Sequence, residues 1–553
     1  MNCNALVLVN TSSKSNYEKY RKYIRPYLNY FGFSFSELDI RECRDLERLD
    51  DYALYLVGHK GVITDLPAEM SARLMTQIRS GSGIVSFNDW THSAGGAEYR
   101  NADRIDIIGR HYITALHDAD EPIHLYQRSI VSNCLRLDSG TVLASASGMP
   151  VLEVAFHGKG KIVLWHNIQW ISHDVLGPVH GMDDLFWRSM VWAARKPFLM
   201  QGIPPLLSMR VDDVWGAGRG GNRDDPFYWV EVCNKYGIRP WLGLFPDNMR
   251  ENSIAQLKKI TDAGNAEVFP HAFSGESVKT GDPAVSEEWI YFDHKGKREY
   301  SEDLIRENIV RTTEWMGSHS LPISKVALGH YYEIGKNALP YLKDWGCEFI
   351  GMHMKPGQSY SPDGDWLVGG PYRLYESGKM KSAWPVFYAH YLEADGMPSS
   401  DLYNIVVEIR DIAGYEWAPD NDVNGTVRRG FAQLKRAFDS MVPAVLFTHE
   451  SDHIQYINPE TWEEIIGRIV EACAAYKPEY TTLEESCRYM RARQNIRIVN
   501  VEFNNGKLHA DLRGKNDMPT KCYVFLESPQ GEIQSMLTDI PALSGDTCVE
   551  VDL

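Results

Sequence analysis

The sequence predicts a multidomain α/β protein with three parts, and three observations support this. Strands and helices alternate over residues 1–200, which predicts a parallel-sheet α/β domain. They alternate again over residues 201–490, where polar residues follow the strands, and this predicts a (β/α) barrel. Short alternating strands over residues 495–553 predict a small β-sandwich. A chain of 553 residues is long enough for about three domains.

The composition narrows the class of protein and the kinds of partner. Hydrophobic residues make up 44% and charged residues 24% of the chain, as in globular proteins. A formal net charge of −17 argues against a nucleic-acid partner. No apolar run reaches membrane-spanning length, so we expect no membrane partner. The nine cysteines show no metal-binding spacing, and the N-terminus does not resemble a signal peptide, so we expect a cytoplasmic location.

The N-terminal region begins with a predicted strand at residues 5–9 and a predicted helix at 16–31, which Pro26 should kink or shorten. The other predicted strands are 33–38, 52–57, 83–87 and 158–165, and the other predicted helices are 70–79 and 183–196. Alternation of this kind is typical of βαβ units and a parallel sheet.

The same region resembles the class I glutamine amidotransferase fold. Active members of that family carry a cysteine at a sharp turn after a central strand. Here the strand at 83–87 is followed by Asn88, Asp89 and Trp90, without a cysteine. The resemblance therefore implies a non-catalytic scaffold, through which we expect the chain to form a homo-oligomer.

The central region alternates in the same way. The predicted strands are 206–211, 240–245, 266–269, 325–328, 348–351, 405–409 and 444–447, and the predicted helices are 229–236, 254–263, 302–316, 337–345, 426–440 and 459–476. Polar residues come just after four of the strands: Asp212 and Asp213; His271; His330 and Glu333; His449 and Glu450. In a barrel, these residues converge on the face that carries catalysis.

The stretch from Leu206 to Gly218 contains two adjacent carboxylates, Asp212 and Asp213, at the end of an apolar run. Neighbouring residues on a strand face opposite sides unless the strand ends there. One aspartate can then bind a metal while the other does acid–base work.

Residues 205–485 resemble the polysaccharide deacetylase (NodB homology) family. Asp212 and Asp213 match the paired aspartates of its first motif, and His271 matches the first histidine of its second. The second histidine of that motif falls on Gly275, next to Glu276. His330 takes the place of the arginine in the third motif, and His449 matches the last motif.

The resemblance and the residue types together predict a hydrolytic metal site. Asp213 and His271 would hold a divalent metal, with zinc expected, and His330 is preferred to Glu276 as the third ligand. Asp212 would deprotonate the attacking water and His449 would protonate the leaving group. Glu450 is the third residue that we predict to be catalytic.

Five further residues are predicted to bind a carbohydrate substrate. Arg210 would pair with a carboxylate inside the barrel or on the substrate, and Trp215 and Trp384 would either stack on a sugar or pack in the core. Glu333 and His453 complete this set, although His453 would alternatively orient His449. The loop-like run at 351–375 is expected to lie over the mouth of the barrel.

Three functions fit the sequence. The leading hypothesis is a metal-dependent carbohydrate deacylase that removes acyl groups from an N- or O-acylated sugar. The second is a glycoside hydrolase that pairs Asp212 or Asp213 with Glu333 or Glu450. The third is an inactive carbohydrate-binding protein. Metal content and the released product distinguish them.

The C-terminal region follows a polar stretch, Arg491 to Asn495, that we expect to be a linker. The predicted strands are 496–503, 507–514, 521–528 and 548–553, with polar turns between them. No catalytic group is expected there.

Overall fold

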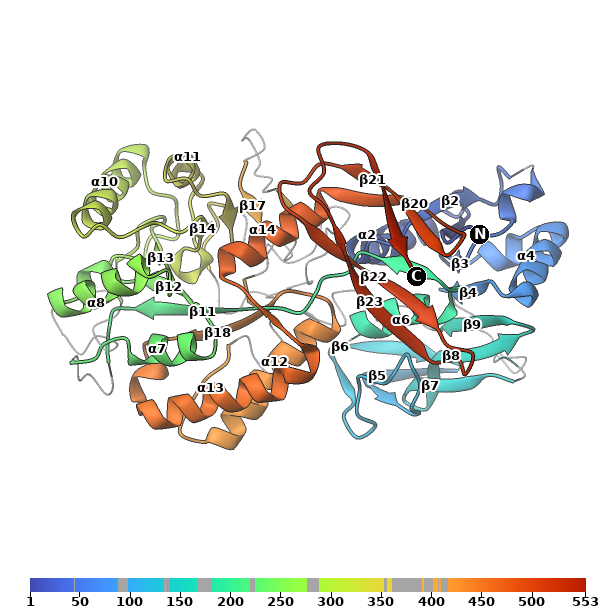
Figure 1. The fold of residues 1–553 in the computed structure, drawn as a ribbon, viewed down its shortest axis with the longest axis horizontal. Helices are drawn as coiled ribbons and strands as arrows, with labels where there is room; N and C mark the ends of the chain where they lie inside the picture. The colour runs from blue at the N-terminus through green and yellow to red at the C-terminus, as the bar shows by residue number, and fades with distance from the viewer. Residues whose placement is uncertain are drawn as a thin grey trace.

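The computed structural model shows an elongated mixed α/β molecule with two lobes (Figure 1). It describes residues 1–43, 45–87, 98–133, 137, 139–166, 182–218, 224–275, 288–352, 356–360, 390–391, 401–405, 407–408 and 416–553. The central region forms one lobe, and the N-terminal region forms the other together with the C-terminal strands. Among the helices described, none is long and apolar enough to cross a bilayer.

The N-terminal region contains a nine-stranded mixed sheet with the order β2-β1-β3-β4-β9-β8-β7-β5-β6. Five neighbouring strands are parallel: β2 (Phe35–Asp39), β1 (Ala5–Val9), β3 (Leu54–Val57), β4 (Gly83–Ser86) and β9 (Gly160–Trp165). An antiparallel extension follows: β8 (Met149–His157), β7 (Thr141–Ala146), β5 (Tyr99–Ile107) and β6 (Ile123–Ser132). The prediction of a parallel sheet is therefore correct for the first five strands and wrong for the four strands of the antiparallel extension.

Helices accompany this sheet. They are α1 (Lys14–Lys19), α2 (Arg25–Phe31), α3 (Val62–Asp65), α4 (Ala68–Ser80) and α6 (Asp183–Ala193), and all but α3 overlap a predicted helix. A π-helical turn, Tyr20–Ile24, joins α1 to α2 directly before Pro26, where the sequence predicts a kink. Gly81 ends α4 with a φ of 125°, a conformation that suits glycine.

The central region contains two sheets built mainly from parallel strands. One has the order β13-β12-β11-β18, with β19 also paired to β11; the other has the order β14-β15-β17-β16. The strands of the first are β11 (Leu206–Val214), β12 (Trp241–Leu244), β13 (Glu267–Pro270), β18 (Ala444–His449) and β19 (Glu479–Tyr480). Those of the second are β14 (Val326–Ala327), β15 (Phe349–Ile350), β16 (His390–Tyr391) and β17 (Tyr403–Asn404).

Backbone hydrogen bonds join these two sheets beside β13. Ser324 N donates to Val268 O at 2.8 Å, and His330 N donates to His271 O at 3.1 Å. The closed barrel itself stays a prediction. The strand expected at 405–409 follows β17 directly, and Ile405 N still donates to Ile350 O of β15 at 3.0 Å. Residues 406 and 409 are outside the described part of the chain.

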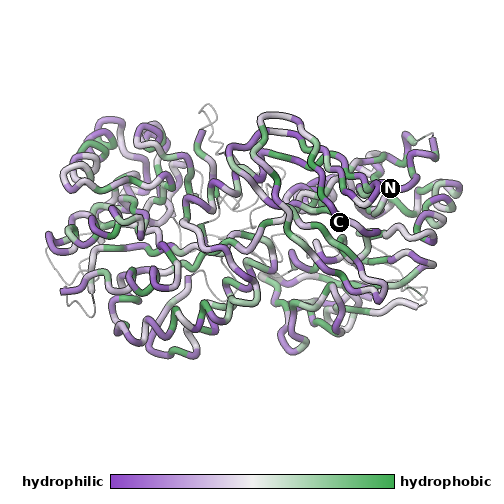
Figure 2. Tube along the Cα trace, viewed as in Figure 1, coloured by the Kyte–Doolittle hydropathy of each residue, from purple (hydrophilic) through white to green (hydrophobic). Residues whose placement is uncertain are grey.

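Seven helices are described around these sheets: α7 (Tyr228–Lys235), α8 (Glu251–Asp262), α10 (Glu302–Ser318), α11 (Leu339–Asp344), α12 (Val423–Asp439), α13 (Pro459–Cys473) and α14 (Leu483–Gln494). Fully buried rings, among them Trp229, Trp417 and Trp462, pack the helices onto β11 and β18. Figure 2 shows the apolar residues gathered along the strands and the polar residues on the outer helices. This core fixes the ends of the strands that carry the site.

The C-terminal strands form two three-stranded antiparallel sheets, as expected for a sandwich. One has the order β20 (Ile496–Asn504), β21 (Lys507–Gly514) and β24 (Thr547–Asp552). The other has the order β10 (Phe198–Met200), β22 (Thr520–Glu527) and β23 (Ile533–Ile540). The expected linker at 491–495 is wrong: α14 continues to Gln494, and Arg493 is buried and donates to the backbone carbonyls of Tyr30 and Gly202.

Candidate metal and catalytic site

Two adjacent aspartates enter one site because β11 loses its regular pairing where they lie. The register between β11 and β12 shifts between Val211 and Val214, and Asp213 has a φ of 56°. A bulge re-aims side chains, and aspartate tolerates left-handed backbone better than most residues. Both carboxylates therefore approach the same imidazole. His271 Nε2 lies 3.4 Å from Asp212 Oδ2 and 3.9 Å from Asp213 Oδ1.

Three buried side chains form a group that could hold a metal ion: Asp213 on β11, His271 after β13, and His330 after β14. One potential ligand atom from each lies within 4.8 Å of the other two. His330 Nδ1 is 3.2 Å from Asp213 Oδ1, and none of the three residues is more than 5% exposed. The sequence predicts these three residues as ligands, and the structure brings them together. We refer to them as the Asp–His–His group.

The protonation state of His271 suits a metal ligand. Its Nδ1 lies 2.8 Å from Leu328 O, so we assign the ring proton to Nδ1 and a lone pair to Nε2. Burial lowers the pKa of His271 to about 4, despite the nearby Asp212 and Asp213, so the ring is neutral at pH 7. A neutral imidazole whose second nitrogen donates to a backbone carbonyl is typical of protein metal sites.

Arg210 holds Asp212 through both carboxylate oxygens. The two residues are two apart on β11 and share a face. Arg210 Nε donates to Oδ1 at 2.8 Å, and Nη2 pairs with Oδ2. Burial acts to raise the pKa of Asp212, but the Arg210 guanidinium lowers it, so the carboxylate stays ionised. Of the two roles that the sequence leaves open for Arg210, the structure favours pairing with a carboxylate inside the protein.

The guanidinium of Arg210 has further partners besides Asp212. Its Nη1 lies 3.3 Å from the Tyr332 hydroxyl and 3.6 Å from Glu408 Oε2, and the Tyr332 hydroxyl donates to the same carboxylate. Arg210 also lies over the ring of Phe447, 4.3 Å from its centroid. These contacts fix the guanidinium, and through it the position of Asp212.

His449 lies opposite Asp212 in the β11–β18 register and is paired with a second carboxylate. Its Nδ1 is 2.5 Å from Glu416 Oε1, and His453 Nε2 is 3.1 Å from the same oxygen. Burial alone would lower the pKa of His449, but Glu416 and Asp213 raise it to about 9. Burial alone would raise the pKa of Glu416, but the two histidines lower it to about 2. His449 is therefore protonated at pH 7.

Glu450 supports the loop after β11. Its Oε2 accepts hydrogen bonds from Trp215 N at 2.7 Å and Gly216 N at 2.9 Å, and its Oε1 accepts one from Trp229 Nε1 at 3.1 Å. Burial raises the pKa of Glu450 to about 7, against the effect of these donors. The contacts favour a structural role, so the catalytic role predicted for Glu450 is not part of our proposal.

Three predicted substrate-binding residues also have partners within the protein. The carboxylate of Glu333 accepts hydrogen bonds from Ser359 Oγ and Tyr360 N and pairs with His294 Nδ1. Trp215 is 3% exposed and its indole donates to Ser451 Oγ at 3.0 Å, which favours the packing role. His453 points to Glu416, which favours its alternative role of supporting His449.

Several predicted residues lie outside the described part of the chain. They are Glu276, Trp384, Asn88, Asp89 and Trp90, together with most of the loop at 351–375. Sequence reasoning missed Glu416, Glu408 and Tyr332. Each contacts a partner far away in the sequence, His449 or Arg210, so only the fold reveals the contact.

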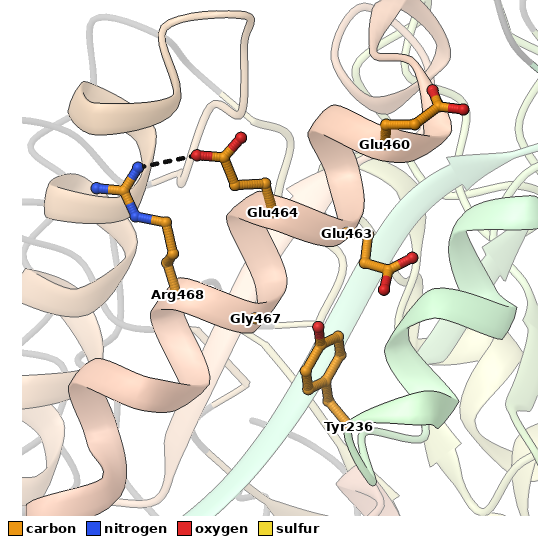
Figure 3. A pocket seen from close by; sticks show the side chains of 6 residues that line it. All are labelled: Tyr236, Glu460, Glu463, Glu464, Gly467 and Arg468. Carbon is orange, nitrogen blue, oxygen red and sulfur yellow. Dashed lines mark hydrogen bonds and ion pairs between the residues drawn. The ribbon is translucent and has the colours of Figure 1, made fainter.

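A shallow surface pocket on α13 is separate from this group of residues (Figure 3). It is lined by Tyr236, Glu460, Glu463, Glu464, Gly467 and Arg468. Glu463 pairs with Lys235, and Glu464 pairs with Arg468 at 3.2 Å. Two of its three acidic side chains thus take part in surface ion pairs, and the pocket shares no residue with the Asp–His–His group.

Three solved structures resemble this chain remotely. No family model matches the sequence, and no curated protein matches it. A polysaccharide deacetylase described as putative, from Mycobacterium smegmatis, is 11% identical, with 52% of this chain and 91% of that chain covered and a TM-score of 0.30. A family 30 xylanase from Clostridium acetobutylicum is 11% identical, with coverages of 65% and 95% and a TM-score of 0.21.

A third solved structure, PurLQS from Thermotoga maritima, is 14% identical, with 30% of this chain and 87% of that chain covered and a TM-score of 0.20. Likenesses this distant decide no function. The described structure itself defines a mixed α/β protein with a buried Asp–His–His group that could hold a metal ion.

Proposed function

We propose that the chain is a metal-dependent hydrolase that removes acyl groups from an N- or O-acylated sugar or oligosaccharide. One observation carries the reaction class: a potential metal-ligand group lies beside an ionised carboxylate, Asp212, and a protonated imidazole, His449. Two titratable groups held in opposite charge states are typical of an acid–base pair. The sugar in the proposal comes from the sequence resemblance to polysaccharide deacetylases.

The donor set fits a divalent ion such as zinc. It offers one carboxylate and two imidazoles, and the neutral His271 directs its Nε2 toward Asp213. A metal bound by Asp213, His271 and His330 would supply Lewis-acid chemistry for the acyl carbonyl and the water.

The protein residues supply the proton transfers. Asp212, oriented by Arg210, accepts the proton of the attacking water. His449, oriented through Nδ1 by Glu416, donates the proton on its other nitrogen to the departing amine or alcohol. Burial of both groups keeps competing water away and strengthens their electrostatic effect.

Product analysis tests this proposal. We expect acetylated sugars to release acetate without new reducing ends, a chelator to stop the release, and zinc to restore it. New reducing ends in the presence of the chelator would instead establish a glycoside hydrolase. A protein that binds the sugars and releases neither product would contradict any hydrolase.

A further inference from the structure

We propose that four rings beside His330 form the subsite that receives the sugar ring of the acylated substrate; this inference rests on the proposed function. The rings belong to Trp289, His294, Tyr331 and Tyr360, and we refer to them as the aromatic cluster. They come from three separate segments of the chain, and the sequence did not single out any of them.

The aromatic cluster is built by stacking. The ring centroids of Trp289 and His294 lie 4.5 Å apart with an interplanar angle of 15°. Those of His294 and Tyr331 lie 4.8 Å apart, also at 15°. Tyr360 follows at 5.1 Å from Tyr331 with a tilt of 41°. Such offset or tilted pairs are favourable and give a continuous aromatic surface.

The aromatic cluster adjoins the Asp–His–His group through His330. The centroid of the His330 ring lies 4.4 Å from that of Tyr331 and 5.9 Å from that of Trp289. A substrate ring that rests on the cluster therefore has its substituents within reach of the proposed metal ligands.

A buried carboxylate holds the aromatic cluster in place. Glu333 Oε2 lies 2.7 Å from His294 Nδ1, and its Oε1 accepts hydrogen bonds from Tyr360 N at 2.6 Å and Ser359 Oγ at 3.0 Å. Tyr331 has a φ of 53°, an unfavourable conformation for a large side chain. Strain of this kind persists where the surrounding contacts enforce it, and it is concentrated at functional sites.

The aromatic cluster combines apolar faces with polar groups. The His294 side chain is 27% exposed, and Tyr331 and Tyr360 are half-buried. Trp289 is 5% exposed, and in the described part of the chain its buried indole N–H makes no hydrogen bond. Buried donors nearly always have an acceptor. A sugar offers both components: a C–H face for the rings, and hydroxyl or acyl oxygens for the donor.

The test compares two substrates in the full-length protein. One is the N-acetylglucosamine trimer; the other is ethyl acetate, which has an acyl group and no ring. We expect Tyr331→Leu and Tyr360→Leu each to lower the ratio of kcat/KM for the trimer to that for ethyl acetate about tenfold, mainly through KM. Metal content, measured alongside, reports whether His330 has moved.

The matched control is Tyr99→Leu, which removes a ring that is 62% exposed on β5, and the ratio should not change. His294→Asn keeps an N–H donor for Glu333 and replaces Tyr331→Leu if that variant does not fold. An unchanged ratio in the cluster variants, with wild-type metal content, would overturn the subsite and leave the proposed function standing.

Failure of the proposed function has a different signature, in which the wild-type protein hydrolyses neither substrate. Direct binding of the trimer then decides the subsite. About tenfold weaker binding by Tyr360→Leu than by the wild type supports the aromatic cluster, and equal binding overturns it.

Discussion

Arg210 and Glu416 each fix the charge of one neighbour in the site. Arg210 keeps Asp212 ionised in a buried position, and Glu416 keeps His449 protonated. Without these partners, burial would neutralise both groups. The sequence predicts Asp212 and His449 because each follows an apolar strand, but it gives no sign of Glu416, whose contact with His449 spans 33 positions.

Asp212→Asn tests the proposed general base. The amide cannot accept a proton from water, whereas Asp213, His271 and His330 remain available to the metal. We expect kcat to fall by about 10²–10⁴ with bound metal retained and little change in substrate affinity, measured by steady-state kinetics and metal analysis. Near-normal kcat would rule out Asp212 as the base.

Glu416→Gln tests the proposed general acid, His449, through the pH dependence of kcat/KM. His449 has a raised pKa of about 9, so the protonated form is present at neutral pH and is lost as the pH rises through 9. Removing the negative charge lowers that pKa toward the ordinary 6.5. We expect the basic limb of the kcat/KM profile to move to lower pH by a unit or more. The control is Glu464→Gln on the surface of α13, which should leave the basic limb in place. An unchanged basic limb in Glu416→Gln would contradict the pairing of His449 with Glu416.

Elements with apolar runs between turn residues are the ones that the sequence predicts well. Strand β1 matches its predicted range, and the predicted helix at 70–79 lies within α4. The antiparallel strands β5, β6, β7 and β8 were missed, since strands that follow one another without intervening helices give no βαβ signal. The end of α14 was mistaken for a linker because its polar sequence conceals the burial of Arg493.

The site was predictable where its residues follow strands. Asp213 lies near the end of β11, His271 and His330 follow β13 and β14, and the fold brings the three together. The aromatic cluster and Glu408 were not predictable, because they lie in segments whose positions depend on long-range packing. The bulge in β11, which turns both aspartates into one site, also has no clear sequence signal.

Glu450→Gln tests the support of the loop after β11. An amide offers only one acceptor oxygen where the carboxylate accepts from Trp215, Gly216 and Trp229, so at least one buried N–H loses its partner. We expect the free energy of unfolding to fall by about 1–3 kcal/mol in denaturant titrations. The exposed Glu460→Gln on α13 should be nearly neutral. Equal stability of the two variants would show that Glu450 does not anchor the loop.

At the scale of the whole molecule, the two ends of the chain belong to one structural unit. Cys3 N donates to Val501 O and Phe503 N donates to Met1 O, both at 2.9 Å. Strand β10 pairs with β22, and Phe525 of β22 belongs to the same core as the N-terminal strands. The predicted division at residues 200 and 495 stays a prediction, although these contacts cross both boundaries.

Phe525→Ala tests this coupling. The side chain is 2% exposed and lies opposite Phe198 in the β10–β22 register, so its removal leaves a cavity between the two ends of the chain. We expect a loss of about 3–5 kcal/mol, with the N-terminal sheet and the C-terminal strands still unfolding together in calorimetry. Leu537→Ala, on the exposed side of β23, should cost less than about 0.5 kcal/mol. Separate transitions for the two ends would contradict a single unit.

The number of metal ions per chain, measured together with acetate release, tests the central claim most directly. We expect about one divalent ion per active wild-type chain, and we expect Asp213→Asn to lose metal and activity together because a ligand carboxylate is removed. Asp262→Asn, on the surface of α8, is the control and should retain both. A metal-free wild-type protein that releases acetate at full rate, or an Asp213→Asn variant with normal metal content and turnover, would contradict the account.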